Sequence, residues 1–151
     1  MKKVIVVTIF YLFGIQSIAH SQVVVIAHKN SPVSNISSAS LSNLYLGEIN
    51  KLSNGTKVIP LDLKKGNEAK EIFYEAIFGK SVTKMQGYWM EKLLTGRGKP
   101  PKSFSSEEGL LREVASDISA IGYVSISNVN GDVKVLTLDG AKPGENGYKL
   151  N

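Results

Sequence analysis

The sequence predicts a single α/β domain in a three-layer-like arrangement around a mixed sheet. Apolar runs at residues 23–27, 57–63 and 121–126 have the length and β-branched content of buried strands. Between them, apolar residues recur at the three- and four-residue spacing of amphipathic helices. Strands that are separated by helices favour parallel neighbours, because a crossover connection is needed between parallel strands. The chain shows no internal repeat and no second domain, and residues 22–151 are enough for one core.

The first 21 residues are expected to be a secretory signal peptide. Lys2 and Lys3 precede an apolar run over residues 4–15, and Ala19-His20-Ser21 offers a small-x-small cleavage site. The apolar run is too short for a convincing membrane helix. The sequence has no cysteine, which excludes disulfides, thiol catalysis and a lipid anchor on an N-terminal cysteine. We therefore expect the mature protein, residues 22–151, in the periplasm.

The first half of the mature chain predicts two strands around a short helix. The strand at residues 23–27 is followed by a polar loop and a helix that Ser40 is expected to cap. Gly47 ends this helix. Asn54-Gly55 marks a tight turn before the second strand, residues 57–63.

Two longer helices are predicted in the middle of the chain. The first runs over residues 67–78 and ends at Gly79. Its inner face is expected to consist of Ile72, Phe73, Ala76 and Ile77. The second runs over residues 82–94, before a Gly/Pro loop at residues 95–101. Its inner stripe is expected to consist of Met85, Tyr88, Trp89 and Leu93.

The last third predicts a helix followed by two strands. Ser105 and Glu108 have the spacing of a capping box. The buried face of the helix that follows is expected to consist of Leu110, Leu111, Val114, Ala115 and Ile118. Apolar stretches at residues 121–126 and 133–138 flank Asn130-Gly131, a pattern typical of a β-hairpin or of adjacent strands.

Composition argues against several classes of chemistry. His28 is the only histidine of the mature chain, and no G-x-S-x-G motif accompanies it, so a Ser-His-Asp triad is not indicated. Metal-ligand spacing is absent as well, and no cofactor is expected. The mature charge of +3, with both signs interspersed, does not favour nucleic acid as a partner. A hydrolase is therefore not indicated, and we do not expect an enzyme.

The segment PLDLKKGNEAKEIF, residues 60–73, carries the candidate site. An apolar strand turns through two lysines, Gly66 and Asn67 into a helix N-terminus. Free backbone N–H groups and the helix dipole at such an end favour an anion.

Four blocks of sequence, in order, resemble the phosphate-type periplasmic solute-binding proteins (PstS-like). They are VVVIAHKNSPVSNISSASLSNLYLGE, then VIPLD with GNEAKEIFYEAIFGKS and YWMEKLLTGRGKPP, then SAIGYVS, and finally VKVLTLDGAKPGENGYKL. The resemblance covers nearly the whole mature chain. It implies the fold of the second lobe of a type II periplasmic binding protein, with no counterpart of the first lobe, so the usual interlobe cleft cannot form within one monomer.

The resemblance also bears on the anion site. Full-length phosphate binders have R-x-x-G-S-G-T at this turn, where the Arg forks onto phosphate. Here Leu63 stands at the Arg position and Glu68 brings a negative charge close by. The ligand-binding residues we predict are Asn30, Ser31, Lys64, Lys65, Gly66, Asn67 and Lys70. Two interpretations remain open: a weak oxyanion site, or a capped helix start beside a solvated face of lysines.

The expected function is periplasmic solute binding, nominally of phosphate or a related oxyanion, as part of or accessory to an ABC-type uptake or sensing system. The partner would then be a membrane transporter or sensor protein. An alternative is an interaction or sensor module that keeps the fold without binding a ligand. A homodimer that rebuilds a cleft is a third. Exposed apolar side chains around Leu46 or Leu52 would favour the last two.

Overall fold

The computed structural model of the protein describes residues 21–151, so the predicted signal peptide lies outside the described residues except for Ser21. The strands are β1 (Val23–His28), β2 (Asn35–Ile36), β3 (Ile59–Leu63), β4 (Lys102–Phe104), β5 (Ala120–Ser125), β6 (Val133–Val135) and β7 (Thr137–Leu138). The helices are α1 (Ser38–Tyr45), α2 (Glu68–Phe78), α3 (Val82–Leu94) and α4 (Glu107–Ser116), with a 3-10 turn at Ile126–Asn128.

The main sheet is mixed, as expected, and has the strand order β4-β3-β5-β1-β6. Strand β3 is parallel to both β4 and β5, whereas β1 is antiparallel to β5 and β6. The short strands β2 and β7 pair in parallel outside this sheet.

The predicted hairpin between the last two apolar stretches is wrong, because β1 lies between β5 and β6. A two-residue hairpin turn needs positive φ at its central residues. Neither Asn130 nor Gly131 adopts positive φ. The Asn130 side chain instead accepts a hydrogen bond from the backbone N–H of Asp132 at 3.0 Å, within a longer connection.

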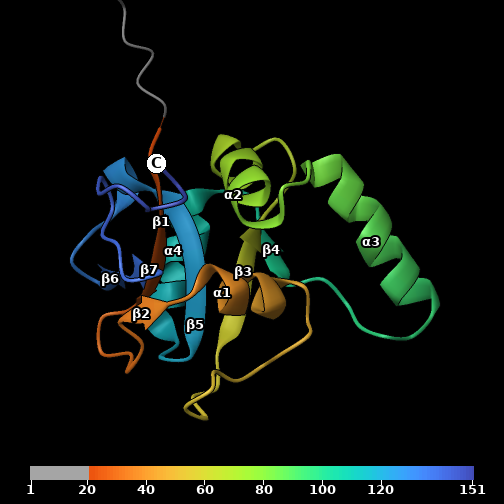
Figure 1. Ribbon diagram of the computed structural model, residues 1–151, viewed down its shortest axis with the longest axis horizontal. Coiled ribbons are helices and arrows are strands. Elements are labelled where there is room, and N and C mark those ends of the chain that lie inside the picture. The colour runs from red at the N-terminus through yellow and green to blue at the C-terminus, as the bar shows by residue number, and fades with distance from the viewer. Residues whose placement is uncertain (1–20) are drawn as a thin grey trace, which may run out of the picture.

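Helices cover both faces of the sheet and give the three expected layers (Figure 1). The Tyr123 ring of β5 stacks on Phe73 of α2, with ring centroids 4.0 Å apart. The preceding residue, Gly122, faces α4, since a Cβ there would lie 2.5 Å from the Leu110 side chain. Neighbouring strand residues point to opposite faces, so α2 and α4 lie on opposite sides of the sheet.

Polar side chains cap each helix at its N-terminus. The caps are Ser37, Asn67, Ser81 and Ser106, each accepting a hydrogen bond from the backbone of the first turn. The predicted caps Ser40 and Ser105 are therefore wrong, by three residues and by one. Each belongs to a serine-rich run in which several residues could cap by type. The residue that caps is the one whose backbone is still extended just before the helix begins.

Helix α3 begins beside α2 and extends outward from the body of the protein (Figure 1). Val82, Met85 and Trp89 are buried, but the predicted inner residue Leu93 is 50% exposed. Its neighbours Met90 and Leu94 are 58% and 80% exposed. The prediction for Leu93 is wrong because the C-terminal half of α3 extends past the body, so its stripe has nothing to pack against.

Two other predicted faces also differ. Ile118 lies beyond the end of α4 and is 52% exposed. On α2 the buried residues are Ala69, Lys70, Phe73 and Tyr74, while the predicted Ile72 and Ile77 are only partly buried. Helix α2 is thus rotated so that a lysine and a tyrosine face the sheet.

Within residues 21–151, no helix combines the length and the apolar character needed to cross a bilayer.

Candidate functional site

The candidate site lies at the edge of the sheet where β3, β4 and β5 end and where α2 and α4 begin. Gly66 has a φ of +95°, which a residue with a side chain rarely adopts, and lets the chain reverse after β3. The Lys64 N–H donates to the Phe104 carbonyl at 2.8 Å, which ties the turn to β4. The Asn67 side chain accepts from the Ala69 N–H at 2.9 Å and caps α2.

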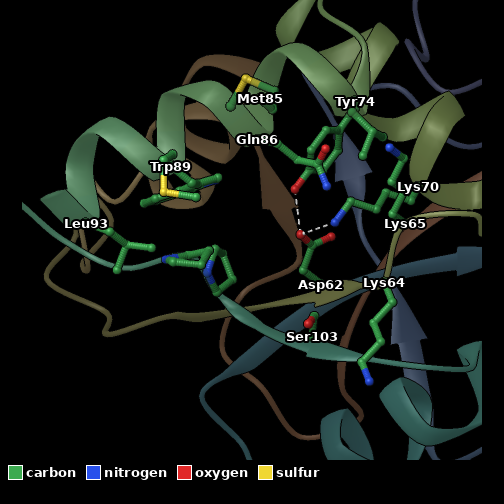
Figure 2. A pocket seen from close by; sticks show the side chains of 14 residues that line it. Asp62, Lys64, Lys65, Lys70, Tyr74, Met85, Gln86, Trp89, Leu93 and Ser103 are labelled. Atoms are coloured by element: carbon green, nitrogen blue, oxygen red, sulfur yellow. Dashed lines mark hydrogen bonds and ion pairs between the residues drawn. The ribbon is translucent and has the colours of Figure 1, made fainter.

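A buried carboxylate, Asp62, lies beneath this turn (Figure 2). Its Oδ2 accepts hydrogen bonds from Lys70 Nζ at 2.8 Å and from the Tyr74 hydroxyl at 2.5 Å. Its Oδ1 accepts from the Tyr123 hydroxyl at 2.5 Å. Lys70 Nζ also donates to the Leu63 carbonyl at 2.6 Å. The charge of Lys70 is therefore matched within the protein.

The tyrosines of this cluster are held neutral. Burial raises the pKa of Tyr123, Tyr74 and Tyr45 well above the usual value, and the negative charge of Asp62 raises it further. A neutral hydroxyl can donate to a carboxylate, as Tyr74 and Tyr123 do to Asp62.

The lysines of the predicted site do not act together. Lys64 and Lys65 are exposed, in keeping with a solvated face, but Lys70 is only 8% exposed. The prediction of a solvated face is wrong for Lys70, because Asp62 draws its side chain under the turn. A signal was present in the sequence: a lone Asp in an apolar strand, with Lys and Tyr four residues apart on the next helix.

Asn30 and Ser31 follow the carboxyl end of β1, which lies at the opposite end of the strands from this site, so they do not join it. Because β1 is antiparallel to β5, its carboxyl end lies beside Ala120 and the start of β3. The Ser31 hydroxyl accepts from the Val33 N–H at 3.3 Å, and the Ser31 carbonyl accepts from Lys134 Nζ at 2.5 Å. The expectation that this loop contributes to the anion site is wrong.

A polar hollow of about 530 Å³ opens between the N-termini of α2 and α4. It is lined by Asn67, Ser105, Ser106, Glu107, Glu108, Leu111, Asn128 and Asn130. Glu107 is already engaged, since it accepts from the Ser125 N–H and from Asn128 Nδ2, both at 2.7 Å. The first turns of the two helices carry four carboxylates: Glu68, Glu71, Glu107 and Glu108. These charges oppose an incoming anion.

A second hollow, also of about 530 Å³, lies on the α3 side of Asp62 (Figure 2). We call it the α3 groove. Its walls are mostly apolar and are lined by Val82, Met85, Gln86, Trp89, Met90, Leu93, Pro100 and Pro101. Its polar end is lined by Asp62, Lys64, Lys65, Lys70, Tyr74 and Ser103. No cluster of residues suited to a metal ion occurs within residues 21–151.

Comparison with solved structures identifies the fold. The chain is similar to a protein described as a phosphate ABC transporter substrate-binding protein of Clostridium perfringens, solved with bound phosphate, at a TM-score of 0.64 and 21% identity. The match covers 81% of this chain and 46% of that one. An ABC-type phosphate transport receptor of Vibrio cholerae matches at a TM-score of 0.68 and 17% identity, over 85% and 52% of the two chains.

PstS of Borrelia burgdorferi matches at a TM-score of 0.63 and 12% identity, over 85% of this chain and 53% of that one. Neither a protein-family model nor a curated protein matches the sequence. The chain thus spans about half the length of the solved structures that it matches. The protein has the α/β fold of one lobe of the PstS-like phosphate-binding proteins, as the resemblance implied.

Proposed function

We propose that the protein is a periplasmic solute-binding protein that takes a small oxyanion, nominally phosphate, as part of or accessory to an ABC-type uptake or sensing system. The observation that carries this proposal is the polar hollow, where two helix N-termini, Asn67 and the Ser105-Ser106 pair converge at the carboxyl edge of β3. Open α/β sheets bind ligands at this edge. The fold shared with phosphate binders supports the same assignment.

The proposed binding is weak. Leu63 is fully buried where the phosphate binders have an arginine, and Lys70 is paired with Asp62. Two carboxylates, Glu107 and Glu108, line the hollow, and Glu68 and Glu71 lie in the first turn of α2. A flexible lysine such as Lys64 does not replace the bidentate arginine fork. We expect a dissociation constant for phosphate on the order of 1 mM, about −4 kcal/mol.

Isothermal titration calorimetry of residues 22–151 against phosphate, with sulfate as the comparison anion, tests this proposal. Asn67→Asp keeps the helix cap but adds a negative charge at the hollow, so binding should be lost. Asn54→Asp is the matched control, because Asn54 caps an exposed turn elsewhere through its own side chain. No heat at about 10 mM phosphate, a concentration well above that constant, would overturn the proposal.

A second candidate is an interaction or sensor module that binds no solute. The observation that favours it is the exposed apolar stripe of Met90, Leu93 and Leu94 on α3. Leu46 and Leu52, whose exposure would also favour this candidate, are instead partly buried against the core.

A further inference from the structure

The α3 groove has the shape of a trough. The α3 residues that line it, from Val82 to Leu93, recur at three- and four-residue spacing along about 16 Å of helix. The edge of the sheet faces them, with Ser103 of β4 and the Pro100-Pro101 pair that precedes it. An occupant would lie along α3 with apolar groups toward Trp89 and Met85.

The groove is too open for a small molecule. Sites for small ligands enclose about 70–90% of the ligand surface, whereas Met90 and Leu93 remain half-exposed on the rim. The hollow is also concave, so a flat bilayer does not reach its floor at Trp89. Contiguous exposed apolar side chains of this kind mark contacts with other macromolecules.

The chain segment that forms the helical wall of the groove is strongly basic, although its charged side chains lie outside the lining of the groove. Residues 80–104, which contain α3 and its loop to β4, carry six basic side chains and one carboxylate, a net +5. The rest of residues 21–151 carries ten basic and twelve acidic side chains, a net −2. Within the described chain, only Lys92 and Lys102 of those six form salt bridges, with Glu48 and Glu113. Lys64 and Lys65 add further exposed positive charge to the groove.

The positive charge of this region favours a partner that carries carboxylates. A symmetric dimer through the groove would bring two segments of charge +5 together, which is unfavourable. A partner with carboxylates is complementary. Extension of the sheet by an added strand is disfavoured, because β4 has only three residues and follows two prolines. A helix that presents an apolar stripe flanked by acidic residues fits all of these conditions.

The groove is already formed in the protein without a partner. Lys92 Nζ donates to the Leu46 carbonyl at 2.8 Å and to Glu48 Oε1 at 2.7 Å, and the Tyr88 hydroxyl donates to the same carbonyl at 2.9 Å. These contacts fix α3 against the end of α1. A preformed groove avoids the entropy of ordering a binding surface, which favours association.

We propose that the α3 groove binds an acidic amphipathic helix of a partner protein. This inference rests on the second candidate function and is independent of oxyanion binding. Apolar side chains of the partner helix lie against Trp89, Met90 and Leu93, and its carboxylates face Lys64 and Lys65.

Trp89, the only tryptophan of the chain, reports occupancy of the groove by its fluorescence. The probe is a synthetic helix of about 14 residues, the length that spans α3, with leucines on one face and glutamates on the other. We expect a saturable shift of Trp89 emission that weakens with salt. A peptide of the same composition in scrambled order should not produce it.

Matched variants locate the binding. Leu93→Glu, and separately Lys64→Glu with Lys65→Glu, should each weaken binding about tenfold or more, as the loss of central contacts does. Leu94→Glu is the control, because Leu94 is more exposed than Leu93 but does not line the groove. All these side chains are exposed, so folding should be unaffected, which circular dichroism checks.

Several results would overturn the inference. They are no emission shift at about 1 mM peptide, an equal response to the scrambled peptide, or equal loss in Leu93→Glu and Leu94→Glu. Sedimentation that shows a dimer abolished by Leu93→Glu would assign the groove to a second copy. Binding to anionic phospholipid vesicles without binding to the peptide would assign it to a membrane. Phosphate calorimetry on the same variants keeps the two proposals separate, since Leu93→Glu should leave any phosphate heat unchanged.

Discussion

At the scale of single residues, the Asp62 cluster decides what the turn after β3 can do. A buried carboxylate is costly unless it is paired and hydrogen-bonded. Here one ammonium group and two tyrosine hydroxyls satisfy it. No buried side-chain polar atom within residues 21–151 lacks a hydrogen-bond partner. The cluster joins β3, α2 and β5, so it holds the turn in place while taking Lys70 away from any solute.

Removing Asp62 alone should be strongly destabilising. Asp62→Ala leaves the Lys70 ammonium group buried without a counter-charge, and we expect the free energy of unfolding to fall by about 3–5 kcal/mol. The double variant Asp62→Leu with Lys70→Met removes both charges and should recover part of that loss, because the Tyr74 and Tyr123 hydroxyls still lose their acceptor. Urea unfolding followed by circular dichroism measures both. If the free energy of unfolding of Asp62→Ala lay within about 1 kcal/mol of that of the parent, less than a tenfold change in the folding equilibrium, this view would be contradicted.

The buried tyrosines predict loss of stability in alkali. Because burial raises the pKa of Tyr123 and Tyr74 in the folded protein, ionisation near pH 10 occurs only in the unfolded chain. Their contribution to stability is complete below about pH 10 and is lost as the pH rises above it, by about 1.4 kcal/mol per pH unit for each tyrosine. Tyr123→Phe should reduce this slope. Unfolding curves between pH 8 and pH 11, on either side of the usual tyrosine pKa of about 10, measure it, and an unchanged slope would count against the assignment.

At the scale of elements, the close approach of α4 to β5 depends on one glycine. Gly122 leaves room for Leu110 and Val114, which pack against the backbone of the central part of β5. This contact sets the position of α4, and with it the Ser106 cap at the polar hollow.

Gly122→Ala should therefore destabilise the protein. The added Cβ would lie 2.5 Å from Leu110 Cδ2, so the buried Leu110 side chain or the helix that carries it must shift, at a cost of about 1–3 kcal/mol. Gly131→Ala is the control, since nothing lies within 4 Å of its added Cβ and its φ is not positive. We expect that variant to equal or slightly exceed the parent in thermal stability. Equal melting temperatures for both variants would show that α4 adapts without cost.

The sequence predicts the helices and strands better than it predicts which strands pair with one another. Helix α3 has the predicted bounds, and Asn67 and Gly79 cap α2 as expected, because these signals are local. Strand β4 was missed, since three residues after a Gly/Pro loop carry no periodicity. The pairing of β1 between β5 and β6 is a long-range outcome that no local pattern encodes.

The site was predicted in part for the same reason. Gly66 and Asn67 form the turn and helix cap that the sequence indicates. Asn30 and Ser31 were misplaced because strand direction is a property of the whole sheet. Lys70 does not face the solute site because it pairs with Asp62, a carboxylate buried in the sheet beneath the turn.

At the scale of the whole molecule, a compact sheet core carries a peripheral helix. Only the first half of α3 is buried, and polar contacts to Leu46 and Glu48 tether the second half. Few buried contacts imply a low free energy of local opening.

Hydrogen exchange should therefore divide the protein into two parts. We expect amides of β1 and β5 to exchange only by global unfolding, and amides of α3 to exchange by local opening. Lys92→Met removes the Lys92 contacts of this tether, leaving that of Tyr88, and should speed exchange in α3 without changing β5. Exchange followed by mass spectrometry or NMR tests this, and equal protection of α3 and β5 would show a single cooperative unit.

The place of β1 in the sheet also shapes how the protein acquires its structure. Val25 pairs with Tyr123, and Ile26 pairs with Val135, so the first strand waits for partners about 100 residues further along the chain. Closing loops of that length is slow, and a chain emerging from the ribosome has no finished sheet until nearly all of it is available. Such delayed folding would suit the proposed periplasmic location, which requires the chain to cross a membrane as an extended polypeptide before it folds.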